Sequence, residues 1–213
     1  MKLMYARTAA QRLYLTLLHE ARPPIVIASG PAGTGKTFLA CRAGADALVK
    51  RRVDRIVLTR PAVSVDEQHG YLPGTLEQKM DPWVRPMVDS LRSYYNPKQI
   101  RDLMYDGIIE ICPLAYMRGR TFDNAWIIAD EMQNSTPSQM RMVLTRIGND
   151  SKMVVTGDPK QHDRGFEDNG LHDFVHRLES FHIPNSIQHV EFTDQDVIRH
   201  PVIKEVLEVY SRD

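Results

Sequence analysis

The most informative stretch for chemistry is an eight-residue loop rich in glycine. It reads GPAGTGKT from Gly30 to Thr37, which matches the spacing G-x-x-x-x-G-K-[ST] of phosphate-binding loops. In such a loop the backbone N–H groups turn toward phosphate oxygens, the lysine reaches the β- and γ-phosphates, and the last hydroxyl binds Mg²⁺. Lys36 is therefore a candidate catalytic residue and Thr37 a candidate metal ligand. We expect a nucleotide to be bound by Gly30, Pro31, Ala32, Gly33, Thr34, Gly35, Lys36, Thr37 and Phe38.

Two adjacent carboxylates form a second candidate group. Asp130 and Glu131 follow the apolar run 126–129, and ligands of open α/β sheets bind at the carboxyl ends of strands. Asp130 is suited to orient Mg²⁺ through its water shell, and Glu131 is suited to take a proton from an attacking water. A plainer interpretation is that the pair caps a helix beginning near Pro137. The guanine-reading motif Asn-Lys-x-Asp does not occur in the sequence, which disfavours a GTPase.

A third polar turn, at 157–161, follows another apolar run. Asp158 or Gln161 could contact the γ-phosphate from a neighbouring strand. On its own, Gly-Asp-Pro is an ordinary turn. Its functional interpretation therefore depends on the other two motifs, and Gln161 joins Lys36 and Glu131 among the candidate catalytic residues.

Short apolar runs separated by helix-forming stretches surround these motifs. Such alternation is typical of crossover connections and a parallel sheet. Helical spacing also covers 5–20, and two helices are expected near 76–94 and 98–105 within the longest interval between runs. We expect one α/β domain over 1–213 with a helical insertion at 61–107. The expected strands lie at 25–28, 56–58, 108–111, 126–128, 153–155 and 188–192.

Composition excludes several classes of protein. The 213 residues are 42% hydrophobic and 25% charged, and no apolar run approaches the length of a membrane span. The first residues carry no export signal, and two cysteines, Cys41 and Cys112, cannot form a disulfide framework, so we expect a cytoplasmic protein. The net charge of zero hides a balance of +8 over residues 1–60, which have 11 Lys+Arg and 3 Asp+Glu. That basic part could face phosphates or be ordinary solvated surface.

Seven motifs in order resemble the PhoH family of ATPases over nearly the whole chain. They are the phosphate loop, LTRPAV (58–63), GYLPG (70–74), PLAYMRGRT (113–121), DEMQN (130–134), LTRIG (144–148) and MVVTGD (153–158). The resemblance extends to the N-terminal motor domain of superfamily 1 helicases. It implies a P-loop NTPase fold, an α/β parallel sheet of order about 5-1-4-3-2 with helices on both faces, and ATP with Mg²⁺ as ligands. It also implies links to RNA metabolism.

The resemblance assigns further roles. It places the strand at 153–155 between the phosphate-loop strand and the strand at 126–128, so that Gln161 approaches the γ-phosphate. Gln11 resembles a glutamine that reads adenine, although it could simply lie on the polar face of the first helix. Arg146 or Arg199 could act as an arginine finger, although a surface role is equally open for either.

The coupling of hydrolysis to other work stays open. RNA or single-stranded DNA is one expected partner, and aromatic residues of the insertion could stack on bases, although Trp83, Met87, Leu91 and Tyr94 also have the spacing of a helix core. A single motor domain would need neighbouring subunits, which favours a hexameric ring. The alternative is an ATP-dependent switch on a protein partner, and a small-molecule kinase is disfavoured by the acid pair. His172 and His176 are spaced as a metal pair, but surface histidines explain them better.

Overall fold

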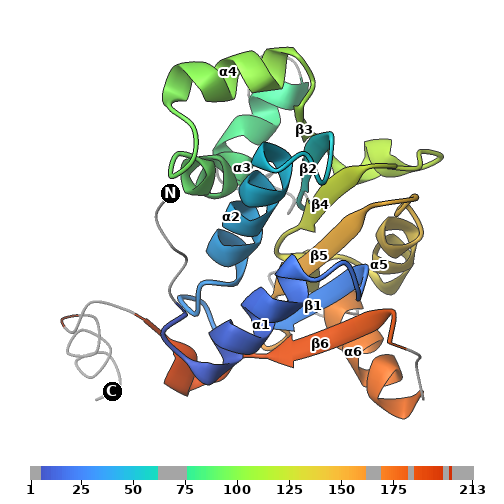
Figure 1. Cartoon of the computed structure of the whole chain (residues 1–213). Coiled ribbons are helices and arrows are strands. Elements are labelled where there is room, and N and C mark those ends of the chain that lie inside the picture. Colours follow the sequence, from blue (N-terminus) through green and yellow to red (C-terminus); the bar gives the residue numbers. More distant parts are fainter. Residues whose placement is uncertain (1–5, 62–75, 162–168, 182–184, 199–201, 203–213) are drawn as a thin grey trace.

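A single parallel sheet forms the centre of the protein (Figure 1). The computed structural model describes residues 6–61, 76–161, 169–181, 185–198 and 202, with the backbone alone for 76–83. Within these residues the strand order is β3-β2-β4-β5-β1-β6, and all five pairings are parallel. The strands are β1 (Ile25–Ser29), β2 (Arg55–Thr59), β3 (Ile109–Ile111), β4 (Ala125–Ala129), β5 (Lys152–Gly157) and β6 (Ile187–Glu191).

This order confirms the expected α/β fold of P-loop NTPases. Counted over five core strands, 5-1-4-3-2 corresponds to β6-β1-β5-β4-β2, and β3 adds a sixth strand at the edge beside β2. β5 lies between β1 and β4 as expected. The strands β1, β4 and β5 are buried over their whole length, as in parallel sheets covered on both faces.

Helices cover both faces of the sheet (Figure 1). One face packs against α1 (Ala9–His19), α2 (Lys36–Val49), α3 (Leu76–Leu91) and α4 (Pro97–Tyr105), and the other against α5 (Pro137–Leu144) and α6 (Gly170–Ser180). Three short 3₁₀ helices complete the described part: η1 (Leu114–Met117), η2 (Met132–Asn134) and η3 (Asp194–Asp196). None of the helices in the described residues is long and apolar enough to cross a membrane.

Two helix boundaries differ from the expected ones for local reasons. α1 begins at Ala9 instead of residue 5, because the Thr8 side chain accepts a hydrogen bond from the Gln11 N–H and caps the helix. α3 ends at Leu91, after which the chain turns toward the Asn96 cap of α4.

The helices of the expected insertion belong to the same core as α2. Val84, Met87 and Leu91 of α3 are fully buried in the cluster that α2 lines, so the core interpretation is right for Met87 and Leu91. Arg85 of α3 is exposed, and so is Arg92, which directly follows the helix. Tyr71 and the side chain of Trp83 lie outside the described residues.

The strand register brings the three motifs to one edge of the sheet. Ser29 pairs with Gly157, and Ala129 pairs with both Val155 and Thr59. Because the strands are parallel, the segments that follow β1, β4, β5 and β2 all emerge at their carboxyl ends.

Candidate functional site

The phosphate loop joins β1 to α2 in a conformation that needs its glycines. Gly30, Gly33 and Gly35 have φ angles of 132°, 86° and 87°, a region that side chains disfavour. At Gly30 there is also no room, since a Cβ there would lie 2.1 Å from the carbonyl oxygen of Phe192. Gly35 is the N-cap of α2 and supplies no side-chain cap. The first turn of α2 therefore starts in the loop, where helix N–H groups favour an anion.

Lys36 lies inside the loop and is 8% exposed. Its ammonium donates to the carbonyl oxygens of Gly30 at 2.6 Å and Pro31 at 2.7 Å, and to Thr34 Oγ1 at 3.3 Å. Burial lowers the pKa of Lys36, while the carboxylates of Asp158, Glu131 and Asp130 act in the opposite direction. An ammonium has three donors, so contact with a phosphate oxygen would exchange one of these bonds.

Asp130 is the centre of the expected metal site. It is 3% exposed, and its Oδ1 accepts hydrogen bonds from Thr37 Oγ1 at 2.6 Å and Thr156 Oγ1 at 2.5 Å. Its backbone N–H donates to the Thr59 carbonyl at 2.9 Å. The structure thus brings Thr37 and Asp130 into direct contact. Carboxylate and hydroxyl oxygens are the hard donors that Mg²⁺ prefers, so this pair fits a magnesium ion.

Glu131 is held in an unusual conformation beside Asp130. Its φ angle of 54° is left-handed, which is rare for a residue other than glycine and clusters at functional sites. Gln133 Nε2 donates to its Oε2 at 2.5 Å, and the Arg60 guanidinium lies 3.7 Å from its Oε1. The plainer interpretation of the acid pair is wrong, because α5 is capped by Thr136.

The turn after β5 closes the other side of the site. Asp158 is 7% exposed, its N–H donates to Gln133 Oε1 at 3.1 Å, and its carboxylate accepts the Lys160 N–H. A cavity of about 260 Å³ opens between this turn and the loop. The structure brings Gln161 to this cavity together with Lys36 and Glu131. The lining residues are Ala32, Gly33, Gly35, Lys36, Thr37, Phe38, Asp130, Glu131, Gly157, Asp158 and Gln161.

Gln11 contacts the phosphate loop directly. Its Nε2 donates to the Thr34 carbonyl at 2.9 Å, and its Oε1 accepts the Arg7 N–H at 2.8 Å. It lines a cavity of about 380 Å³ on the far side of the loop, next to Phe38, which is 44% exposed. The Arg42 guanidinium lies over the Phe38 ring at 5.3 Å. Adenine recognition by Gln11 stays a prediction, and the contact that the structure describes is with the loop.

Of the two candidate arginine fingers, the structure describes Arg146 and does not bring it to this site. Arg146 lies at the amino end of β4, where it donates to the carbonyls of Met142 and Arg120. At about 3.3 Å per residue, the five residues of β4 put it roughly 16 Å from the carboxyl edge. In this chain it therefore cannot reach the phosphates of its own loop. Arg199 lies outside the described residues.

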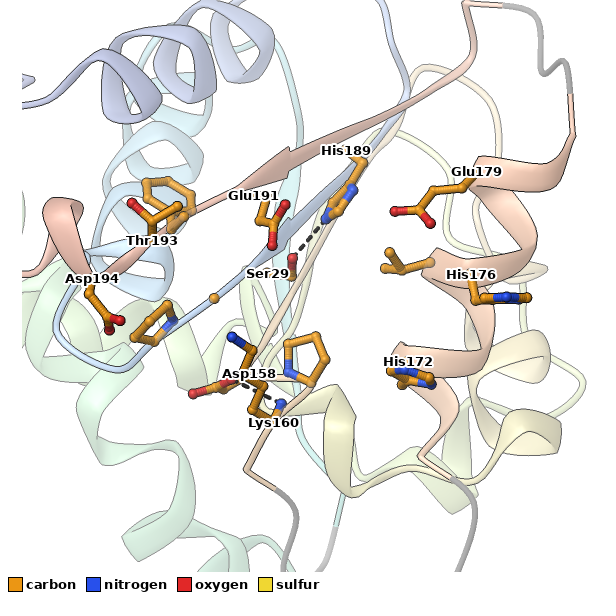
Figure 2. A pocket seen from close by; sticks show the side chains of 15 residues that line it. Ser29, Asp158, Lys160, His172, His176, Glu179, His189, Glu191, Thr193 and Asp194 are labelled. Atoms are coloured by element: carbon orange, nitrogen blue, oxygen red, sulfur yellow. Dashed lines mark hydrogen bonds between the residues drawn. The ribbon is translucent and has the colours of Figure 1, made fainter.

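A second cavity of about 360 Å³ lies beside the loop, between β6 and α6. Figure 2 shows His172, His176 and Glu179 of α6 on one side and Glu191 and Asp194 on the other. His189 hydrogen-bonds Ser29 Oγ at 2.7 Å, which links β6 to the residue before the loop. Burial lowers the pKa of His189 against the opposing effect of nearby glutamates. The described residues contain no group of three or more His, Cys, Asp or Glu side chains that could hold a metal ion.

Three residues of the site were not identified from the sequence. Thr156, Gln133 and Arg60 were not expected to contact the acid pair. Thr156 lies within a resembling motif, but only the pairing of β4 with β5 brings it to Asp130. Gln133 also lies within such a motif, two residues after Glu131, and the same pairing brings it to Asp158. Arg60 follows β2, whose pairing with β4 brings it to Glu131. The order of the strands in the sheet therefore decides these contacts, and the spacing of the motifs along the chain does not show that order.

Comparison with known proteins gives a family match over residues 3–211, to the family described as PhoH-like protein. The PhoH-like protein of Synechocystis sp. is 44% identical over 99% of this chain and 63% of its own length. That of Bacillus subtilis is 43% identical over 99% and 65%. The helicase domain of Pyrococcus furiosus Hef matches 90% of this chain and 39% of its own at 14% identity, with a TM-score of 0.49. The chain spans about three fifths of the length of these curated relatives.

Proposed function

The chain belongs to the PhoH-like family, and from this premise we propose that it binds ATP with Mg²⁺ and hydrolyses the γ-phosphate by attack of water. One observation carries the proposal. Lys36, Thr37, Asp130 and Glu131 come from two different strand ends and line one cavity of about 260 Å³. A phosphate loop alone would serve a kinase equally well, whereas an acid beside the metal pair favours water as the nucleophile.

Each residue of the cavity would have a distinct task. Lys36 and the loop N–H groups would bind the β- and γ-phosphates and stabilise the charge that develops there. Thr37 and Asp130 would hold Mg²⁺, which supplies charge neutralisation when bound. Glu131 would accept a proton from the attacking water at its carboxylate. Gln161, which lines the same cavity, would contact the γ-phosphate.

We further propose that hydrolysis is coupled to RNA or single-stranded DNA in a ring of subunits. Arg146 lies at the edge of the sheet opposite to its own loop, which suits a residue that would serve a neighbouring subunit. A hexamer is the proposed assembly. The described cysteines, Cys41 and Cys112, are buried free thiols, which supports a reducing compartment such as the cytoplasm.

Steady-state ATP hydrolysis by the wild type and Glu131→Gln tests the proposed reaction. We expect the substitution to lower kcat by about 100-fold or more, because it removes the proton acceptor. Binding of a non-hydrolysable ATP analogue should persist in the variant, since Lys36 and Thr37 are unchanged. Glu179→Gln is the matched control, because Glu179 is exposed on α6. Wild-type activity that survives in Glu131→Gln would contradict the role of Glu131.

The same assay with single-stranded RNA and DNA tests the coupling. We expect one of the two to stimulate hydrolysis by the wild type, and the more effective strand identifies the partner. Hydrolysis that depends on Glu131 and ignores both strands would instead support a switch acting on a protein partner. Light scattering in the presence of ATP tests the ring, and a monomeric mass would contradict it.

A further inference from the structure

Gln133 connects two segments of the nucleotide site that follow different strands. It lies in η2, directly after β4, and is 5% exposed. Its Nε2 donates to Glu131 Oε2 at 2.5 Å, and its Oε1 accepts the backbone N–H of Asp158 at 3.1 Å. One amide therefore uses its donor on the acid after β4 and its acceptor on the turn after β5. A planar amide has a fixed separation between these two atoms, so the contacts cannot move independently.

Within the part of the chain that the structure describes, the Glu131 carboxylate has few other contacts. The side chain is 36% exposed. Its second carboxylate oxygen lies 3.7 Å from the Arg60 guanidinium, which is close enough for an ion pair but too far for a hydrogen bond. The bond from Gln133 is the shorter of the two contacts and the more directional one. The left-handed backbone at Glu131 further limits the orientations of the side chain. Among the described residues, Gln133 is thus the main contact that sets where the Glu131 carboxylate lies.

The surroundings of Gln133 leave it little freedom. A Cβ at Gly157 would lie 2.5 Å from Gln133 Oε1 and 3.2 Å from its backbone nitrogen. The amide oxygen is therefore packed against the last residue of β5, where only glycine leaves enough space. Any displacement of the turn at 158–161 would consequently be transmitted to the amide instead of being absorbed by a rotation of the side chain.

We propose that Gln133 is a positioning residue that sets Glu131 according to the position of the turn at 158–161. The inference rests on the proposed hydrolysis and deepens it. Gln161 belongs to this turn and lines the cavity with Lys36. Contact of Gln161 with a γ-phosphate would fix the turn, and through Gln133 it would fix the acceptor for the water proton. A nucleotide without a γ-phosphate would leave the acceptor less well placed.

Two substitutions separate this role from a structural one. Gln133→Met keeps the size of the side chain and loses both bonds. Gln133→Glu keeps an acceptor for the Asp158 N–H but replaces the donor to Glu131 by a carboxylate. We expect both to lower the single-turnover rate of ATP hydrolysis by about 10- to 100-fold, since misplacement of a catalytic group by 1 Å has effects of this size. The affinity for a non-hydrolysable ATP analogue should change less than about threefold, because no contact of the loop is altered.

A double-mutant cycle that combines Gln133→Met with Glu131→Gln gives the second measurement. If Gln133 acts through Glu131, the double variant Glu131→Gln/Gln133→Met should be no slower than Glu131→Gln alone. Gln139→Met is the matched control, because Gln139 caps α5 and its loss should lower stability without changing the rate.

Two outcomes would overturn the inference, and a third would overturn the proposed function. Wild-type rates in Gln133→Glu would overturn it, since Gln133 would then only satisfy the Asp158 N–H. A double variant in which the rate losses of the two single variants multiply would overturn it too, since the two residues would then act separately. If the wild type itself fails to hydrolyse ATP, the proposed function fails before the role of Gln133 is reached, so the two failures are distinguishable.

Discussion

At the end of β4, one carboxylate oxygen of Asp130 accepts hydrogen bonds from threonines of two other segments, Thr37 and Thr156. Thr156 is fully buried, and its hydroxyl orients an acid that has almost no contact with solvent. A hydrogen bond to a buried charged group contributes more than one between neutral groups. Thr156 therefore belongs to the proposed metal site, although it would not itself contact a metal ion.

Thr156→Val tests this orienting role, because valine keeps the shape and removes the hydroxyl. We expect the free energy of unfolding to fall by about 1.5–3 kcal/mol, the value for a hydrogen bond to a charged group. The Mg²⁺ concentration for half-maximal hydrolysis should rise several-fold, as for other residues that orient a metal ligand. Denaturant unfolding and a magnesium titration measure the two effects. An unchanged magnesium requirement would show that Thr37 alone is sufficient to orient Asp130.

Between elements, α2 packs closely against β4 at Gly44. A Cβ at Gly44 would lie 2.6 Å from Cδ1 of Trp126, so the helix rests on the indole ring. In an isolated helix, Gly→Ala stabilises by about 1 kcal/mol. Here we expect Gly44→Ala to lower the free energy of unfolding by about 1–3 kcal/mol through overpacking. Trp126→Phe should relieve the clash, and a double-mutant cycle measures that relief. Strictly additive effects would contradict the contact.

Lys152 joins β5 to α1, and this link should depend on pH. Its ammonium donates to the carbonyls of Leu17 and Glu20 at the end of α1. Burial lowers the pKa of Lys152 from 10.5 to about 8. The unfolded chain therefore holds this proton more tightly, and stability should rise with pH between about 8 and 10.5, by up to about 1.4 kcal/mol per unit. Comparing unfolding of the wild type and Lys152→Met across this range tests the sign, since the variant should lack the rise.

Sequence patterns predicted most elements and failed where distant segments meet. The strands β1, β2, β4 and β5 were predictable because their apolar runs are short and continuous, and the loop because its spacing is specific. The start of α1 depended on one cap, Thr8. The contact of Gln133 with Asp158 and that of Thr156 with Asp130 depend on which strand neighbours β4, a property that spacing along the chain does not encode. For the same reason Arg146 lies at the opposite edge from its own phosphate loop.

Across the whole molecule, the phosphate loop is held by hydrogen bonds to segments that are far from it in the sequence. Gln11, before β1, donates to Thr34, and Ile198, after β6, donates its N–H to the Gly33 carbonyl at 3.0 Å. The Phe192 N–H donates to the Ser29 carbonyl at 2.7 Å. A chain emerging from the ribosome therefore carries the complete glycine motif long before the segment that braces it. Until residue 198 has been synthesised, the nascent protein has the glycine motif without the hydrogen bond from Ile198 to Gly33.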